Sequence, residues 1–264
     1  MPDLSALLWP NVVAVISASP DPTILRGRLM TVMMGHDFKG KIYPISRSHD
    51  EILGLKCHKS IDEVPEQVDL AILIIPAEFI PDTLEQCGKL GVRAAQILTS
   101  GFAEEGGDEG AAVQDEIRAI AKRHDMAVMG PNSEGFANSA AALCPTFSPA
   151  VDNTELPLLP PWRDQGHITA IAQSGGMGFA FYDHGRPKEL PFNYIITTGN
   201  EACVEALDVV DYLLDEGKTD AFVLFMEDVK NGARLAQAGE KALRAGKPII
   251  LTKIGASEAG ARAA

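Results

Sequence analysis

NVVAVISASP at residues 11–20 and ITAIAQSGGMG at residues 168–178 decide the fold of this chain. Each stretch is a short apolar run that ends in a turn of small residues. Small residues at the junction between a strand and a helix let backbone N–H groups and the helix N-terminus approach an anion closely. The repeated pattern predicts two α/β units in one chain, each with a phosphorylated ligand at the end of its first strand.

Short β-branched runs alternate with longer segments of helical spacing through the first half of the chain. This alternation is typical of βαβ units that build a parallel sheet. The predicted strands are Val12–Ile16, Lys41–Ile45, Leu70–Ile75, Ala94–Leu98 and Ala127–Met129. The predicted helices are Thr23–Gly35, Glu78–Gly91 and Asp108–His124. We therefore expect an α/β fold in which residues 1–140 form a Rossmann-like domain.

A proline-rich stretch separates this series from a second one. Prolines remove hydrogen-bond donors and end regular structure, so residues 141–165 are interpreted as a linker on the surface. Beyond it, the predicted strands are Ile168–Ala172, Tyr194–Thr197, Ala221–Met226 and Pro248–Lys253. The helices between them are predicted to begin near Ser174 and to cover Val204–Leu214 and Ala233–Ala245. Residues 166–264 are predicted to form a flavodoxin-like domain.

Composition excludes several classes of function. The 264 residues carry a net charge of -13, which argues against a surface for nucleic acid or anionic membrane, because such binding needs clustered Lys and Arg. The N-terminus has no signal-peptide pattern, and no apolar run is long enough to span a bilayer, which favours a cytoplasmic protein. The four cysteines form no CxxC pair, so we expect buried free thiols, with no metal site and no disulfide.

The first turn differs from that of a typical dinucleotide-binding oxidoreductase. Such a fold carries GxGxxG and an acidic residue about 20 positions later, which holds a ribose hydroxyl. Here the turn is Ser17-Ala18-Ser19-Pro20, and Arg47 follows the second strand. Arg47 can pair with the ribose phosphate of coenzyme A or of NADP. A solvated loop arginine is an equally good interpretation of Arg47 taken alone.

Three further strand ends in the first half are small or polar. Pro76-Ala77 follows the third predicted strand, Thr99-Ser100-Gly101-Phe102 the fourth, and Gly130-Pro131-Asn132-Ser133 the fifth. Open parallel sheets bind their ligands at the carboxyl ends of the strands. We therefore expect these residues, Pro76 and Gly101 among them, to line one cofactor site.

Seven segments, taken in order, resemble the NDP-forming acyl-CoA synthetases of the ADP-forming acetyl-CoA synthetase type. This family is related to the α subunit of succinyl-CoA synthetase, and the resemblance covers nearly the whole chain. The segments are Val15–Ser19, Asp50–Gly54, Ser100–Glu104, Gly130–Asn132, Gln173–Gly176, Thr198–Ala202 and Ser257–Arg262. The resemblance implies a CoA-binding Rossmann domain followed by a succinyl-CoA-ligase-like flavodoxin domain.

The resemblance also implies an activity. A phosphoryl group passes from ATP to a histidine and then to a carboxylic acid, and the CoA thiol attacks the resulting acyl phosphate. ATP or ADP with Mg is bound mainly by an ATP-grasp domain or subunit, and the enzyme is an oligomer. The CoA-binding positions of the family carry over to Ser17, Ala18, Ser19, Pro20, Arg47, Leu98, Thr99 and Ser100.

Four residues are candidates for catalysis and one for substrate binding. Ser174 and Gly175 begin a predicted helix whose N–H groups and dipole would face the phosphoryl group. A nucleophilic role for Ser174 is disfavoured because the GxSxG pattern is absent. Glu227 resembles the family glutamate that hydrogen-bonds the active histidine, although the adjacent Asp228 could serve instead. Asn132 is the fourth candidate, and the resemblance makes Phe179 a wall of the acid site.

The six histidines all lie outside the context in which the family places its catalytic histidine, shortly after residues 259–262. We therefore expect this chain to be a portion of a longer enzyme that lacks the histidine and the ATP-grasp domain. Two alternatives remain open. One is a non-catalytic CoA-binding regulatory module, and the other is an NADP-dependent oxidoreductase that uses Arg47.

Overall fold

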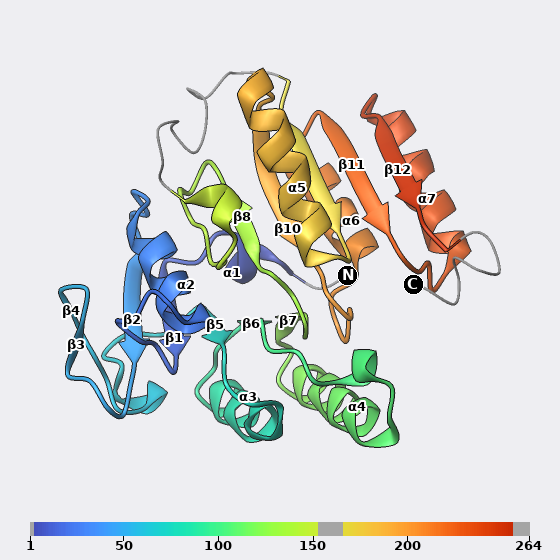
Figure 1. Cartoon of the computed structure of the whole chain (residues 1–264). Coiled ribbons are helices and arrows are strands. Elements are labelled where there is room, and N and C mark those ends of the chain that lie inside the picture. Colours follow the sequence, from blue (N-terminus) through green and yellow to red (C-terminus); the bar gives the residue numbers. More distant parts are fainter. Residues whose placement is uncertain (1–2, 153–165, 256–264) are drawn as a thin grey trace.

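A computed structural model describes residues 3–152 and 166–255 of the chain. Two five-stranded sheets dominate it, one above the other (Figure 1). The first sheet has the order β2-β1-β5-β6-β7, and all of its neighbouring strands are parallel. Its strands are β1 (Val12–Ile16), β2 (Lys41–Ile45), β5 (Leu70–Leu73), β6 (Ala94–Ile97) and β7 (Ala127–Met129). The predicted Rossmann-like sheet is confirmed.

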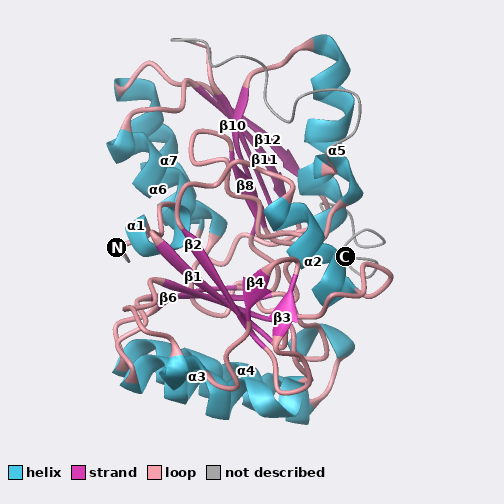
Figure 2. Ribbon diagram, turned by 90° about the vertical axis from the view of Figure 1, so that its left-hand side faces the viewer, coloured by secondary structure: helices cyan, strands magenta, loops and turns pink. Residues whose placement is uncertain are grey.

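Helices cover both faces of the first sheet (Figure 2). They are α1 (Ser5–Leu8), α2 (Leu25–Met34), α3 (Ile80–Lys89) and α4 (Asp108–Arg123). Alternate residues of β1 point to opposite faces. Val13 and Val15 share a core with α1 and α2, whereas Val12, Ala14 and Ile16 share one with α3 and α4. A short hairpin of β3 (Glu51–Ile52) and β4 (Leu55–Lys56) follows β2.

The second sheet has the order β12-β11-β9-β10-β8. Its strands are β8 (Phe136–Asn138), β9 (Ile168–Ala172), β10 (Phe192–Thr197), β11 (Ala221–Met226) and β12 (Ile249–Lys253). The last four are parallel, as the predicted flavodoxin-like unit requires, and β8 pairs with β10 in the antiparallel sense. Helix α5 (Gly175–Gly185) covers one face of this sheet, and α6 (Ala206–Glu216) and α7 (Gly232–Arg244) cover the other (Figures 1 and 2).

The expectation of a surface linker is wrong for residues 141–152. Leu143, Cys144, Thr146 and Val151 are each at most 1% exposed. The prolines end regular structure here, but the polar groups find partners inside the protein: Thr146 Oγ1 donates to the carbonyl oxygen of Glu134 at 2.6 Å. This segment is therefore packed against the second sheet. The remainder of the predicted linker, residues 153–165, lies outside the described residues.

The cysteines agree with the expectation of free thiols. Cys57, Cys87 and Cys144 are buried, Cys203 is half-buried, and all four are free. Burial raises the pKa of Cys87 and of Cys144 to about 12, which makes both thiols poor nucleophiles at neutral pH. In residues 3–152 and 166–255, no helix is long and apolar enough to cross a membrane.

Candidate functional site

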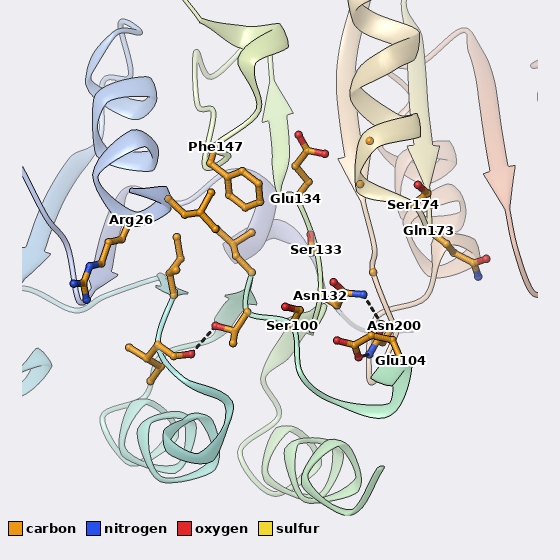
Figure 3. A pocket seen from close by; sticks show the side chains of 18 of the residues that line it. Arg26, Ser100, Glu104, Asn132, Ser133, Glu134, Phe147, Gln173, Ser174 and Asn200 are labelled. Carbon is orange, nitrogen blue, oxygen red and sulfur yellow. Dashed lines mark hydrogen bonds between the residues drawn. The ribbon is translucent and has the colours of Figure 1, made fainter. Parts of the chain in front are cut away.

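The carboxyl ends of the parallel strands of both sheets open into one cavity of about 860 Å³ (Figure 3). Its walls come from the loops after β5, β6 and β7 on one side and from the loops after β9, β10 and β11 on the other. The lining residues are Ile24, Leu25, Arg26, Ile74, Ile75, Pro76, Leu98, Thr99, Ser100, Glu104, Asn132, Ser133, Glu134, Phe147, Gln173, Ser174, Gly175, Gly176, Gly199, Asn200 and Glu227. This volume is in the range of cavities that hold a cofactor or substrate.

The first-sheet side of the cavity combines apolar walls with one guanidinium. Thr99 Oγ1 donates to the Ile75 carbonyl oxygen at 2.7 Å, which ties the loop after β6 to the loop after β5. Arg26 lies in the first turn of α2 and donates from Nη1 to Ser17 Oγ at 3.0 Å. Among the described residues Arg26 has no carboxylate partner, so its charge is open to an anionic ligand. Ser17 itself has a φ of 65°, in the left-handed region.

The second-sheet side presents the N-terminus of α5. Ser174 is the N-cap residue, but its hydroxyl makes no capping hydrogen bond. The first N–H groups of a helix have no partner within the helix and carry its positive dipole end. The predicted anion-binding turn at Ser174 and Gly175 therefore faces the cavity with its donors available (Figure 3).

Gln173 holds the ends of β9 and β11 together. Its Oε1 accepts from the N–H groups of Glu227 at 2.6 Å and Asp228 at 2.8 Å. Its Nε2 donates to Glu201 Oε2 at 2.9 Å and to the Asp228 carbonyl oxygen at 3.0 Å. These contacts fix the backbone of Glu227, so that this carboxylate lines the cavity on the same side as Ser174.

Glu201 is a buried carboxylate beneath the loop after β10. It is 3% exposed and accepts hydrogen bonds from Gln173, from Thr198 Oγ1 at 2.9 Å and from the Ala206 N–H at 2.8 Å. Burial raises the pKa of Glu201 above its ordinary value, against the effect of these donors. The hydrogen bonds to Glu201 therefore offset only part of the free-energy cost of burying its charged carboxylate.

Replacing Glu201 with glutamine should change how the stability of the chain depends on pH. A carboxyl whose pKa is raised by folding contributes most to the stability of the fold when it is protonated. The contribution is complete at a pH below the ordinary pKa of 4.5, and it is lost as the pH rises through the pKa of the folded state. The free energy of unfolding of Glu201→Gln relative to wild type should therefore rise from pH 4.5 to pH 7.5 in urea titrations. Glu116→Gln, at an exposed position of α4, is the control. A relative stability that falls with pH would contradict this.

Asn200 joins the two halves of the cavity. Its Oδ1 accepts from Asn132 Nδ2 at 3.2 Å, and its Nδ2 donates to Glu104 and, at 3.0 Å, to Gln114 Oε1. Burial acts to raise the pKa of Glu104, but the hydrogen bonds from Asn200 and from the Gly101 N–H outweigh it and lower that pKa. The Asn200 N–H also donates to the Pro131 carbonyl oxygen at 2.9 Å. The loops after β6, β7 and β10 are thus held in one arrangement.

The structure gathers eight of the predicted site residues around the cavity: Pro76, Leu98, Thr99, Ser100, Asn132, Ser174, Gly175 and Glu227. Seven others do not line it: Ser17, Ala18, Ser19, Pro20, Arg47, Gly101 and Phe179. Ser17 contacts Arg26 at its edge, whereas Arg47 is exposed beyond β2. Phe179 is 2% exposed and packs in the core under α5, so its ring is not on the cavity wall.

Several cavity residues, Arg26 and Phe147 among them, were not among the predicted site residues. Arg26 and Phe147 carry no sequence signal, because the packing of α2 and of the proline-rich segment brings them there. A second cavity of about 460 Å³ adjoins the first and shares Gln173, Gly199, Asn200 and Glu227 with it. It adds Glu201, Asp228, Lys230, Lys253 and Gly255. Within residues 3–152 and 166–255, no cluster of three or more His, Cys, Asp or Glu side chains is suited to hold a metal ion.

Two family models match successive parts of the chain. A CoA binding domain matches residues 11–139, and a succinyl-CoA ligase like flavodoxin domain matches residues 165–264. The α subunit of ADP-forming acetate–CoA ligase I from Pyrococcus furiosus is 34% identical over 99% of this chain. The chain belongs to the NDP-forming acyl-CoA synthetase family. The CoA-binding domain precedes the ligase-like domain, as the family resemblance implied.

Other members of the family are similar over the same span. An ADP-forming acetate–CoA ligase from Methanocaldococcus jannaschii is 36% identical over 99% of this chain and 35% of its own length. The dinucleotide-forming acetyl-CoA synthetase 1 of Ca. Korarchaeum cryptofilum superposes with a TM-score of 0.87 at 32% identity, over 99% of this chain and 54% of that one. That synthetase has also been solved with phosphate and ADP.

The chain spans about half the length of the Pyrococcus furiosus subunit, 54%, and smaller shares of the longer synthetases. The family motif predicted at Ser257–Arg262 lies outside the described residues.

Proposed function

We propose that this chain is the CoA-binding and phosphoryl-binding part of an acid–thiol ligase, which makes an acyl-CoA from a carboxylic acid, CoA and ATP with release of ADP. One observation carries the proposal: a single cavity joins the strand ends of the CoA-binding domain to the uncapped N-terminus of α5 in the ligase-like domain. A thiol held on one side can then meet an acyl phosphate held on the other.

The first-sheet side of the cavity fits coenzyme A. Arg26 would pair with a pyrophosphate oxygen, and Ser17 would hold the guanidinium in place. Leu98, Ile75 and Phe147 provide apolar surface for the pantetheine arm, while Thr99 and Ser100 offer polar groups beside it. We place the 3′-phosphate at Arg47, because β2 is the neighbour of β1 at the edge of the sheet. When bound, CoA supplies the thiol that accepts the acyl group.

The second-sheet side fits a phosphoryl group or acyl phosphate. The free N–H groups at Gly175 and Gly176 and the Ser174 hydroxyl would bind its oxygens without a side-chain charge. Glu227 would orient the imidazole of a phosphoryl-carrying histidine supplied from outside the described residues. ATP with Mg would be bound by an ATP-grasp domain or subunit, and we propose that the chain works in such an oligomeric assembly. A cytoplasmic location stays a prediction.

Titration calorimetry with CoA, dephospho-CoA and NADP tests the CoA half of this proposal. Arg26→Ala should weaken CoA binding about tenfold, the loss expected for one charge-assisted hydrogen bond in a partly open site. Arg47→Ala should weaken CoA binding but not dephospho-CoA binding, because only CoA carries the phosphate that Arg47 would meet. Arg244→Ala, which removes an exposed arginine of α7, is the control.

Two results would oppose the proposal. Binding of NADP without CoA would favour the oxidoreductase alternative. Failure to bind any of the three compounds would favour a degenerate module without ligand.

A further inference from the structure

Glu134 brings a carboxylate to the N-terminus of α5. It lies on the chain segment that crosses from β7 of the first sheet to β8 of the second, and its side chain is half-buried. A Cβ atom built on Gly175 would lie 2.7 Å from Glu134 Cβ and 3.0 Å from Glu134 Oε2. The absence of a side chain at Gly175 thus creates the space that Glu134 fills. Figure 3 shows Glu134 on the cavity wall between Phe147 and Ser174.

In the part of the chain that the structure describes, no cation pairs with this carboxylate. Among residues 3–152 and 166–255, Glu134 makes no ion pair, and its side chain makes no hydrogen bond. Of the described residues that line the cavity, Arg26 is the only arginine or lysine, and it lies at the opposite end from Ser174 (Figure 3). Its guanidinium contacts Ser17.

The other charged groups of the region are held elsewhere or have the same sign. Glu104 is engaged by Asn200, and Glu227 adds a second carboxylate to the α5 side. Lys230 and Lys253 line only the smaller adjoining cavity. Among the described residues, the charged side chains that line the α5 end of the main cavity are therefore carboxylates, while Lys253 donates to the Glu227 carbonyl oxygen at 2.7 Å from the adjoining cavity.

We propose that Glu134 is a specificity-determining residue for the acyl group: it selects against acids with a second carboxylate and favours acids with a cationic substituent. The inference rests on the proposed function, since the acyl carbon must reach the α5 N-terminus for the thiol to attack the acyl phosphate. Substituents near that carbon then meet the Glu134 carboxylate. A like charge within a few ångströms in a partly enclosed cavity lowers affinity by at least about tenfold.

Three CoA thioesters test this on the chain itself: butyryl-CoA, its cationic near-isostere β-alanyl-CoA, and succinyl-CoA. By calorimetry, wild type should bind succinyl-CoA at least about tenfold more weakly than butyryl-CoA, and β-alanyl-CoA more tightly than butyryl-CoA. Glu134→Gln, which keeps the shape of the side chain, should bring the three affinities within about twofold of one another. Glu134→Leu should do the same, and Glu116→Gln should keep the wild-type order.

Equal affinities of the three thioesters for wild type would overturn the proposal, and so would an unchanged order in Glu134→Gln. Titration with free CoA separates this outcome from failure of the proposed function. CoA should bind wild type and Glu134→Gln equally well, which also shows that the variant is folded. If free CoA fails to bind wild type, the proposed function itself is wrong.

Discussion

Replacing Gly199 with alanine should lower the free energy of unfolding by about 3 kcal/mol, because one methyl group would meet backbone atoms that cannot move independently. A Cβ atom at this position would lie 2.2 Å from the Pro131 carbonyl oxygen and 2.6 Å from the Asn132 carbonyl oxygen. Gly199 also has a φ of +60°, which alanine adopts only with strain. The clash falls where the loop after β10 meets the loop after β7, so the variant should also lose affinity for CoA.

Gly217→Ala is the matched control for this prediction. Gly217 has a φ of +83°, but a Cβ atom there would meet nothing within 4 Å. Its replacement should cost about 1 kcal/mol, from backbone strain alone. Urea unfolding of both variants measures the difference between their free energies of unfolding. This difference is the part of the loss that comes from the close contact of the two loops at Gly199. Equal losses would mean that the junction at Gly199 is not tightly packed.

Replacing Gln173 with leucine should also cost about 3 kcal/mol, since it leaves several buried polar groups without partners. Leucine has a similar volume but cannot accept from the N–H groups of Glu227 and Asp228 or donate to Glu201. The Glu201 carboxylate would keep its burial and lose one of its donors. The end of β11 would be released, and Glu227 would no longer be held on the cavity wall.

Gln67→Leu provides the comparison for Gln173→Leu. Gln67 is exposed, although its Nε2 donates to three carbonyl oxygens, including those of Leu90 and Gly91 at 3.1 Å. Water can donate to those carbonyl oxygens in place of the Gln67 amide, so this substitution should cost less than about 1 kcal/mol in the same unfolding assay. If the two glutamine variants lose equal stability, the network around Glu201 does not carry the stabilisation inferred for it.

Most strands could be predicted from the sequence because they are buried on both faces and read as continuous apolar runs. The predicted strand Leu70–Ile75 ends at Leu73, and its last two residues turn out of the sheet to line the cavity. The strand β8 (Phe136–Asn138) was missed because it is not an apolar run: it ends in a polar residue, whereas the equally short β7 is apolar throughout. It exists because β10 offers an edge to pair with, which is a tertiary effect.

The site could be predicted as far as strand ends define it. Pro76, Thr99, Asn132 and Ser174 follow directly from the rule that parallel sheets bind ligands at their carboxyl ends. That rule does not say how the two sheets face each other. The position of Glu134 against Gly175 depends on that arrangement. The place of Arg26 in the cavity wall depends instead on the packing of α2, which the sequence does not reveal.

Hydrogen exchange measured by mass spectrometry, with CoA and inorganic phosphate added separately and together, tests most directly whether one cavity serves both domains. CoA should slow exchange in residues 74–76 and 98–100, and phosphate should slow it in residues 173–176. The two ligands together should slow exchange in both regions and in the connecting loop at residues 132–134. Protection confined to segments away from these strand ends would contradict a shared CoA and phosphoryl site.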